Sequence, residues 1–241
     1  MVTGSDNELV KKANEIYSRS YWSERNATLA FDSIYSDNES KFLHSKWQSQ
    51  MEFCKHNLGD KKSLFEIGAG KGQNLYFFKS RGFDVFGLEP DKNNVDKINN
   101  LLGSGLCVNG YAETFQTDKK FDIVWMSHVL EHVIDPKIVF KKVYDILNHG
   151  GLFFVEVPNC ECSKMTYSSF QENPSTFGFT LKSLRHLGMI NGFKTIKDGH
   201  FITHLTLIDK VLRKLKIQKS RLSYQRTTPD NGFDLRILFI K

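Results

Sequence analysis

The stretch SLFEIGAGKGQN, which runs from Ser63 to Asn74, decides the fold that this sequence predicts. Its first five residues are mostly apolar, as in a buried parallel strand. Glycines follow at alternate positions, at Gly68, Gly70 and Gly72, and the next residues favour a helix. A strand that turns sharply into a helix presents free backbone N–H groups and the positive end of the helix dipole. Because glycine lets a ligand lie against the backbone, we expect a cradle for a small molecule that contains adenosine.

The spacing of the glycines distinguishes between classes of ligand. The dinucleotide fingerprint G-x-G-x-x-G fails, because its third glycine would fall on Gln73 or on Leu75. A phosphate-binding P-loop ends in Gly-Lys-Ser/Thr, which is absent here. The pattern present is E-x-G-x-G-x-G, with Glu66 as the acid. A glycine-rich turn that holds no ligand is the alternative that this stretch alone leaves open.

From Ser63 onward the chain alternates strand and helix patterns, which predicts a parallel sheet. Six further strands are expected at residues 83–89, 106–109, 121–126, 152–157, 193–197 and 235–240. Helices are expected at residues 91–102, 135–150 and 180–192, with Asp135 and Thr180 as N-caps. Glu89 ends the second strand, and Pro90 stops it. An acid there can accept hydrogen bonds from both hydroxyls of a ribose, although an exposed acid without a ligand is the alternative.

A second informative stretch lies at the fourth expected strand. It reads FDIVWMSHVLEHVIDP from Phe121 to Pro136, and GGLFFVEVPN follows at residues 150–159. Together with the glycine turn, Glu89 and the pair Ala112-Glu113, these stretches resemble the class I S-adenosylmethionine (SAM) methyltransferases. They are most similar to the branch that contains quinone-precursor O-methyltransferases and many sugar and small-metabolite methyltransferases. The resemblance covers about residues 60–160, with a weaker tail to residue 198.

The resemblance implies a fold class and a cofactor. We expect an α/β fold with a Rossmann-like, seven-stranded sheet that is mostly parallel, has an antiparallel last strand and carries helices on both faces. The expected cofactor is SAM. The residues expected to bind it are Glu66, Gly68, Ala69, Gly70, Gly72, Asn74, Glu89, Pro90, Ala112, Glu113, Met126 and Ser127. In the family, the backbone at the position of Ala112 and the carboxylate at that of Glu113 meet the adenine ring.

Three residues after the fourth strand are candidates for the chemistry. His128, Glu131 and His132 stand at i, i+3 and i+4, so a helical turn would place them on one face. In one interpretation a histidine is the general base, and His128 is our choice because it is nearer the strand end. In a second, the three form a two-histidine, one-carboxylate metal face, and in a third they only hold the loop. We assign no metal ion.

The domain organisation follows from the position of these motifs. Residues 1–60 are expected to form an N-terminal helical lid, and residues 61–241 the SAM-binding domain with a basic helical insertion at about residues 198–234. The resemblance makes Tyr21, Trp22 and Arg25 candidates for the lid, whereas a helical layer packed on the sheet is the alternative.

The net charge of +6 is concentrated in one segment. From Ile202 to Arg226 there are seven basic residues against one acidic residue. A solvated basic face is one interpretation. The other is a lid or a dimer element that attracts a phosphorylated or nucleotide-linked acceptor.

The composition of the chain indicates which cellular compartment to expect. No apolar run reaches the roughly 18 residues of a membrane span, and the polar N-terminus does not resemble a signal peptide. The four cysteines do not form a disulfide pattern, so we expect a cytoplasmic protein with reduced thiols.

The leading functional hypothesis is methyl transfer from SAM to an oxygen or nitrogen of a small polar metabolite. The favoured acceptor is a sugar or nucleotide-linked sugar of surface-polysaccharide biosynthesis, a branch of carbohydrate biosynthesis. A nucleic-acid methyltransferase is a second hypothesis, but two motifs are missing. Amino-methylating DNA enzymes carry Asn/Asp-Pro-Pro-aromatic after the fourth strand, where this chain has Ser127-His-Val-Leu130. Cytosine-C5 enzymes need a Pro-Cys pair, where this chain has Pro158-Asn159. A SAM-binding module without catalysis is a third.

Overall fold

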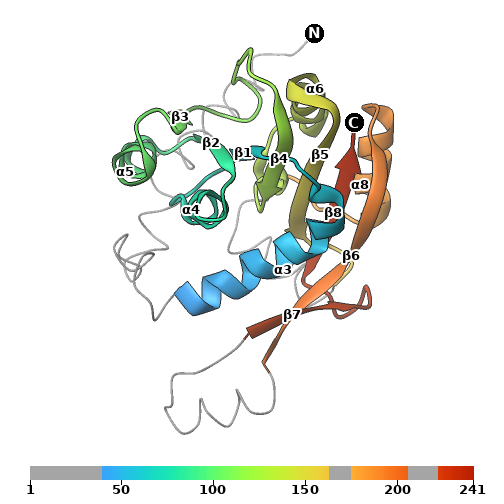
Figure 1. Cartoon of the computed structure of the whole chain (residues 1–241). Coiled ribbons are helices and arrows are strands. Elements are labelled where there is room, and N and C mark those ends of the chain that lie inside the picture. The colour runs from blue at the N-terminus through green and yellow to red at the C-terminus, as the bar shows by residue number, and fades with distance from the viewer. Residues whose placement is uncertain (1–39, 163–174, 206–221) are drawn as a thin grey trace, which may run out of the picture.

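The computed structural model describes residues 40–162, 175–205 and 222–241, which form an eight-stranded sheet with helices on both faces (Figure 1). The strand order is β3-β2-β1-β4-β5-β8-β6-β7. The strands are β1 (Ser63–Ile67), β2 (Asp84–Glu89), β3 (Cys107–Asn109), β4 (Phe121–Ser127), β5 (Leu147–Pro158), β6 (Lys194–Leu205), β7 (Leu222–Thr227) and β8 (Asp234–Ile240). The sequence predicted seven strands, and β7 is the strand that it did not predict.

The direction of the strands divides the sheet into two parts. Strands β3, β2, β1, β4 and β5 pair in parallel. Strand β8 is antiparallel to both β5 and β6, and β7 is antiparallel to β6. The predicted antiparallel last strand is therefore confirmed, as is the mostly parallel α/β sheet.

The helices are α3 (Ser40–Leu58), α4 (Gln73–Lys79), α5 (Lys92–Leu102), α6 (Pro136–Ile146) and α8 (Leu181–Ile190), and η3 (Leu130–His132) is one 3-10 turn. Side chains cap the N-termini of three of these helices. Asp91 and Asp135 accept hydrogen bonds from the first free backbone N–H groups of α5 and α6, and Pro136 stands in the first turn of α6. Thr180 and Ser183 form a reciprocal capping box at α8. The predicted N-caps are confirmed.

Each face of the sheet has its own apolar core. Helices α3, α4 and α5 pack on one face, and α6 and α8 pack on the other (Figure 1). Successive residues of β4 alternate between them, since Ile123 and Trp125 belong to the first core and Val124 and Met126 to the second. Burial on both faces explains why the central strands read as continuous apolar runs.

Three boundaries differ from the prediction. The strand expected at residues 193–197 continues to Leu205, because β6 pairs along its length with β8 and then with β7. The helix expected to end at Gly150 ends at Ile146, and β5 begins at Leu147. The insertion expected to be helical has strands at both of its ends, and its middle, residues 206–221, lies outside the described residues. Tyr21, Trp22 and Arg25 also lie outside them.

The topology creates a crevice beside β1. The chain runs from β1 outward to β2 and β3, and then returns to β4 on the opposite side of β1. The connection after β1, through α4, and the connection after β4, through α6, lie on opposite faces of the sheet. In open α/β sheets, ligands bind at the carboxyl ends of the strands at such a point.

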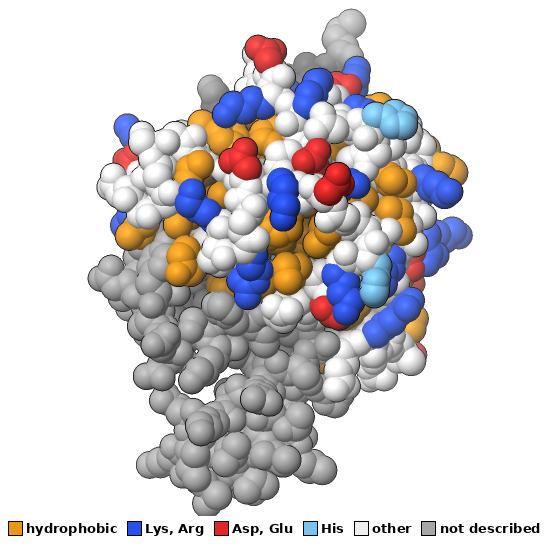
Figure 2. Space-filling view, viewed as in Figure 1, with side chains coloured by type: hydrophobic (Ala, Val, Ile, Leu, Met, Phe, Trp, Pro, Cys, Tyr) orange, Lys and Arg blue, Asp and Glu red, His pale blue; other side chains and the backbone are white. Residues whose placement is uncertain are grey.

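The surface of the described residues indicates no particular class of partner. None of the described helices combines the length and the apolar character that crossing a membrane requires. Basic and acidic side chains are interspersed over the described part of the face in Figure 2. Six of the seven basic residues in the predicted basic segment lie within residues 206–221, outside the described residues, and the seventh, Arg226, donates to the carbonyl oxygen of Asp198 at 2.9 Å. The attraction of a phosphorylated acceptor by this segment stays a prediction.

Candidate active site

A cavity of about 390 Å³ opens at the carboxyl ends of β1, β2 and β4. Its volume lies within the range of small-molecule sites. The predicted site residues that line it are Glu66, Gly68, Ala69, Gly70, Asn74, Glu89, Pro90, Ala112, Glu113, Ser127, His128 and His132. Twelve of the fifteen predicted residues are thus brought together by the fold.

The other three predicted residues, Gly72, Met126 and Glu131, do not line the cavity. Gly72 precedes α4 with φ +75°, and a Cβ there would stand 2.6 Å from Cγ1 of Ile98, so this glycine serves the turn and its packing. Met126 is fully buried in the core, and Glu131 is buried beside the two histidines.

The glycine turn is tied to β2, and a side chain at Gly68 would meet the loop after β4. The N–H groups of Gly68 and Ala69 both donate to the carbonyl oxygen of Leu88, at 2.8 and 3.0 Å. Gly68 has φ +77°, and a Cβ there would stand 2.2 Å from Cγ2 of Val129. The first glycine is therefore required both by its backbone conformation and by the close approach of the loop after β4.

Glu89 is held rigidly at the end of β2. It is 3% exposed, one carboxylate oxygen accepts from the N–H of Gly70 at 2.8 Å, and the other accepts from the N–H of Asp91 at 3.1 Å. Two backbone donors fix the plane of the carboxylate at the cavity wall. An acceptor fixed in this way suits a ligand with paired hydroxyl donors.

Glu66 contributes an unsatisfied acceptor. Its Oε1 accepts from Nδ2 of Asn74 at 2.8 Å, whereas its buried Oε2 has no hydrogen bond. Burial raises the pKa of Glu66 to about 8, although the hydrogen bond from Asn74 opposes the rise. A buried carboxylate oxygen without a partner at a cavity wall indicates that a donor or a cationic group of a ligand belongs there.

The adenine-binding pair predicted by resemblance also reaches the cavity. Glu113 accepts from the N–H of Ile134 at 2.7 Å, which ties the loop after β3 to the segment after η3. Ala112 is 7% exposed and lies in the core on that side. Both residues thus form a wall between the ends of β2 and β4.

His128 stands at the exit of β4 in a strained conformation. Its φ is +55°, which few non-glycine residues adopt, and its N–H donates to the carbonyl oxygen of Glu156 at 2.8 Å. Backbone strain of this kind persists where the surrounding structure fixes it and is concentrated at functional sites. The side chain is 34% exposed and lines the cavity.

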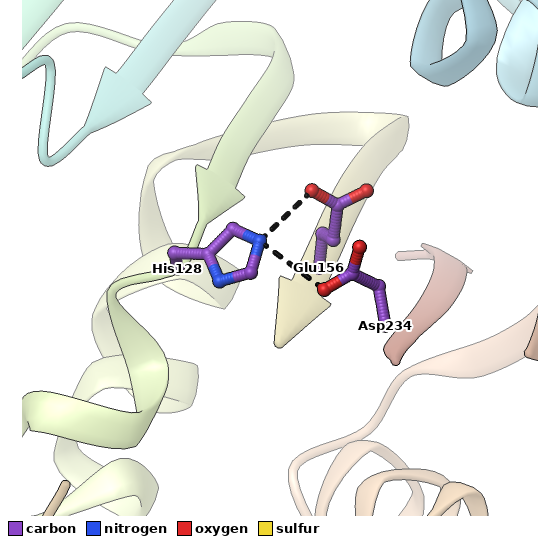
Figure 3. Close-up of side chains that lie close together, drawn as sticks. All are labelled: His128, Glu156 and Asp234. Carbon is purple, nitrogen blue, oxygen red and sulfur yellow. Dashed lines mark ion pairs between the residues drawn. The ribbon is translucent and has the colours of Figure 1, made fainter. Parts of the chain in front are cut away.

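The ring of His128 faces three carboxylates. Its Nδ1 lies 3.5 Å from Oε1 of Glu131, and its Nε2 lies 3.2 Å from Oε1 of Glu156 and 3.5 Å from Oδ1 of Asp234 (Figure 3). Burial and the charge of Lys46 lower the pKa of the ring, but the hydrogen bonds to Glu131 and Glu156 and the charge of Asp234 outweigh them and raise it to about 9. The imidazole is therefore mostly protonated at pH 7.

The predicted helical face is formed in a different way. The 3-10 turn begins at Leu130, so His128 precedes it instead of sharing a helix with His132. Glu131 still lies between the two rings, since its Oε1 is 3.5 Å from Nδ1 of His128 and 3.7 Å from Nε2 of His132. The three residues are together, but through a turn and not through i, i+4 helical geometry.

Glu156 is the most highly connected carboxylate of the site. It is fully buried, and its Oε2 accepts from Nε of Arg236 at 2.5 Å. Its Oε1 accepts from Nε2 of Gln50 at 2.7 Å and lies 3.0 Å from Nζ of Lys46. Although burial opposes ionisation, Lys46, Arg236 and His128 hold the pKa of Glu156 well below its usual range.

His128, Glu156 and Asp234 each offer one ligand atom within 4.8 Å of the others, a spacing that a metal ion could bridge. The charges do not favour this interpretation. The carboxyl groups of Glu131, Glu156 and Asp234 already have Lys46, Arg236 and the protonated His128 as partners, and burial raises the pKa of Asp234, which leaves still less negative charge for a metal ion. A divalent ion would displace the proton of His128 and leave a net positive charge in a buried cluster.

The structure adds residues that sequence reasoning missed. Lys46, Trp47 and Gln50 of α3 line the cavity, as do Lys71, Gln73 and Tyr111. Glu156 and Arg236 left a readable signal, because each is a charged residue inside an otherwise apolar run, and a buried charge requires a partner. The residues of α3 left no such signal in a polar, aromatic-rich segment.

Comparison with known proteins gives a family match. The sequence profile of a family described as a methyltransferase domain matches residues 40–203. A ubiquinone biosynthesis O-methyltransferase from Chelativorans sp. (strain BNC1) is 31% identical over 101 residues, which is 40% of this chain and 40% of that one. A second, from Stutzerimonas stutzeri (strain A1501), is 25% identical over 126 residues, 50% of this chain and 49% of the other. The matches thus span two fifths to a half of the length of these curated relatives.

Solved structures share the fold. A SAM-dependent methyltransferase from Thermotoga maritima, described as a possible histamine N-methyltransferase, has a TM-score of 0.61 and 20% identity, with 88% of this chain and 97% of that one covered. The plantazolicin methyltransferase BpumL, in complex with S-adenosylhomocysteine (SAH), has a TM-score of 0.60 and 15% identity, with 99% of both chains covered. Identities this low establish a common architecture and no more.

Proposed function

The chain belongs to this methyltransferase-domain family, and on that premise we propose that it transfers the methyl group of SAM to a hydroxyl oxygen of a small molecule. The observation that carries the proposal is the continuity of the cavity. The same cavity is lined by the glycine turn and Glu89, which suit a nucleoside, and by the ring of His128, which suits proton transfer.

The residues of the cavity match the parts of the cofactor. The backbone of Gly68 and Gly70 lines the cavity without side chains of its own, and the fixed carboxylate of Glu89 accepts from the two ribose hydroxyls. The free Oε2 of Glu66 accepts from the ammonium group of the methionine part. Ala112 and Glu113 form the wall for the adenine ring.

The bound cofactor supplies a methyl group that is already activated on a sulfonium. The protein then has to align the acceptor oxygen, exclude water and accept a proton. In our proposal His128 accepts that proton. The three carboxylates around its ring make it a stronger base than an unperturbed histidine, but also protonate most of it at pH 7. Turnover is therefore expected to rise with pH toward about 9.

A small-molecule hydroxyl is the acceptor that the observations favour. The cavity volume lies within the range of small-molecule sites. Two relatives are named as O-methyltransferases of ubiquinone biosynthesis, and their acceptors carry over to this chain only as a proposal. The sugar acceptor was expected from the resemblance, and the basic segment suggested only its phosphorylated or nucleotide-linked form. The two relatives do not support a sugar, so we place phenolic hydroxyls first.

The test is a turnover assay with the full chain. We expect purified protein to convert SAM to SAH in the presence of a panel of phenols and catechols, with sugars and amines as comparison acceptors. His128→Ala should lower turnover without weakening SAH binding, whereas His149→Ala, at an exposed histidine outside the cavity, should leave both unchanged. Binding of SAH without turnover of any acceptor would favour the non-catalytic module.

A further inference from the structure

One buried carboxylate joins two walls of the cavity that come from distant parts of the chain. We propose that Glu156 is a positioning residue that fixes both helix α3 against the cofactor cavity and the ring of His128 beside it. The proposal rests on the proposed function for its catalytic meaning, but its structural content concerns only this chain's own residues.

The first contact set joins Glu156 to α3. Its Oε1 accepts from Nε2 of Gln50 at 2.7 Å and lies 3.0 Å from Nζ of Lys46. Both of these side chains, and Trp47 between them, line the cavity. Since Lys46 and Gln50 are one helical turn apart, both can reach the same carboxylate, which fixes the rotation of α3 about its axis.

Arg236 extends this contact set. Its Nε donates to Oε2 of Glu156, and its Nη1 donates to Oγ of Ser49, the residue before Gln50. Arg236 comes from β8 and Glu156 from β5, and they are directly opposite each other in the sheet. Glu156 and Arg236 therefore connect α3 to the middle of the sheet through fully buried groups.

The second contact set joins Glu156 to His128. The carbonyl oxygen of Glu156 accepts the backbone N–H of His128 at 2.8 Å, and its Oε1 lies 3.2 Å from the Nε2 of the ring. Ser127 Oγ donates to the same Oε1 at 3.1 Å. Glu156 thus contacts the backbone and the ring of His128, as well as the residue before it, whose position sets the direction in which the chain leaves β4.

Other charged groups lie around the ring of His128 and the carboxylates that it contacts, and they bear on the test. They are Lys46 from α3, Glu131 and His132 from η3, and Asp234 and Arg236 from β8. Asp234 lies 3.5 Å from Nε2 of His128, and the charge of Lys46 acts on it, but no hydrogen bond or ion pair joins Asp234 to α3 among the described residues; Glu131 lies on the opposite side of the ring. Among the described residues, the carboxylate that reaches both the ring and α3 is that of Glu156.

The test compares two substitutions of Glu156 with a neighbouring control. Glu156→Asp keeps the charge that Arg236 needs but shortens the side chain, so it retains the buried ion pair while losing reach. Glu156→Gln keeps the length but removes the charge. Glu161→Gln is the control, because Glu161 lies five residues along the chain, faces His200 and does not line the cavity.

Three readouts on the full chain separate the two roles. NMR titration of the His128 ring, assigned with His128→Ala, follows the contact of Glu156 with His128. Amide hydrogen exchange of α3 follows the contacts of Glu156 with that helix. Calorimetric binding of SAH follows the cavity itself. We expect Glu156→Gln to lower the titration midpoint of His128 by about one pH unit or more. We expect both Glu156 substitutions to speed exchange in α3 and to weaken SAH binding by about fivefold or more.

Asp234→Asn gives an independent comparison. It should lower the midpoint of His128 and change the exchange of α3 less than Glu156→Gln does, because Asp234 pairs with the ring and acts on α3 through the charge of Lys46. The proposal is overturned if Glu156→Asp and Glu156→Gln leave α3 exchange at the level of Glu161→Gln, or if they leave the His128 midpoint at that of the native chain. Absence of methyl transfer by the native chain would instead refute the proposed function, since the NMR and exchange readouts need no acceptor.

Discussion

Replacing Arg236 with methionine tests the buried ion pair at the centre of the site. Arg236 is fully buried in β8, and its Nε lies 2.5 Å from Oε2 of Glu156, which is also fully buried. The substitution keeps an unbranched apolar side chain in a site where the guanidinium also packs 4.3 Å from the ring of Phe201. What it removes is the charge that compensates a carboxylate that has little access to water.

The expected loss of stability in Arg236→Met follows from the burial of the ion pair. Breaking one partner of a buried ion pair costs about 3–5 kcal/mol, because the other charge is left uncompensated. For a chain of this size each kcal/mol corresponds to about 2–4 °C in Tm. Arg236→Met should therefore lower Tm by roughly 6–20 °C. Removing the stranded charge as well, in the double variant Arg236→Met with Glu156→Gln, should recover part of that loss.

The structure offers a matched control on the surface. Arg185 of α8 pairs with Asp198 through its Nε, in the same chemical arrangement, but the Arg185 side chain is 52% exposed. Exposed pairs contribute about 0–1 kcal/mol, so Arg185→Met should change Tm by at most about 4 °C. Thermal unfolding followed by circular dichroism at pH 7 measures both variants.

The pH dependence gives a second check on the same variant. The pKa of Glu156 is lowered by folding, so its stabilising contribution is present above its unfolded pKa, near 4.5, and is lost as pH falls through the folded value. The difference in unfolding free energy between the native chain and Arg236→Met should be constant from pH 7 to about 5 and narrow below it. Equal losses for Arg236→Met and Arg185→Met at pH 7 would refute the reasoning.

Four further predictions concern the cavity. Glu89→Gln should weaken SAH binding, measured by calorimetry, about tenfold or more, because hydrogen bonds to a charged acceptor contribute about 1.5–3 kcal/mol. The control is Asp84→Asn, at the exposed start of β2. Gly68→Ala should lower both Tm and SAH affinity more than Gly59→Ala, because both glycines have positive φ but only the first meets a side chain, at 2.2 Å. Because the pKa of Glu66 is raised to about 8, the carboxyl group holds a proton at pH 7 in the protein without ligand, and SAH binding should release that proton. The heat of SAH binding should therefore vary with the ionisation enthalpy of the buffer in the native chain but not in Glu66→Gln. The pKa of His128 is raised from 6.5 to about 9, so its contribution to the free energy of unfolding is present below pH 6.5 and lost as pH rises through 9. Urea unfolding should show this loss of stability in the native chain and in the control His149→Gln, and a smaller loss in His128→Gln.

Local chemistry made much of the fold predictable from the sequence. The apolar runs of β1, β2, β4 and β8, the caps Asp135 and Thr180 and the glycine turn each depend on residues within a few positions of one another, so they can be read directly. The same holds for Glu89, whose place at a strand end follows from Pro90. These local signals, in their order along the chain, indicated the alternating parallel sheet, and the family resemblance that they carry gave the rest of the fold class and most of the predicted cavity lining.

What sequence alone did not determine depends on pairing between distant segments. Strand β7 and the extension of β6 stabilise each other as antiparallel neighbours, and neither has a strong pattern of its own. The surroundings of His128 were likewise unpredictable, because Glu156 and Arg236 are 80 residues apart in the chain and meet only through the register of β5 with β8. The sequence by itself determined which residues turn the chain and present a cradle for the cofactor. The tertiary structure decided the protonation of the candidate base, because the charges that set it are contributed by four elements brought together only by folding.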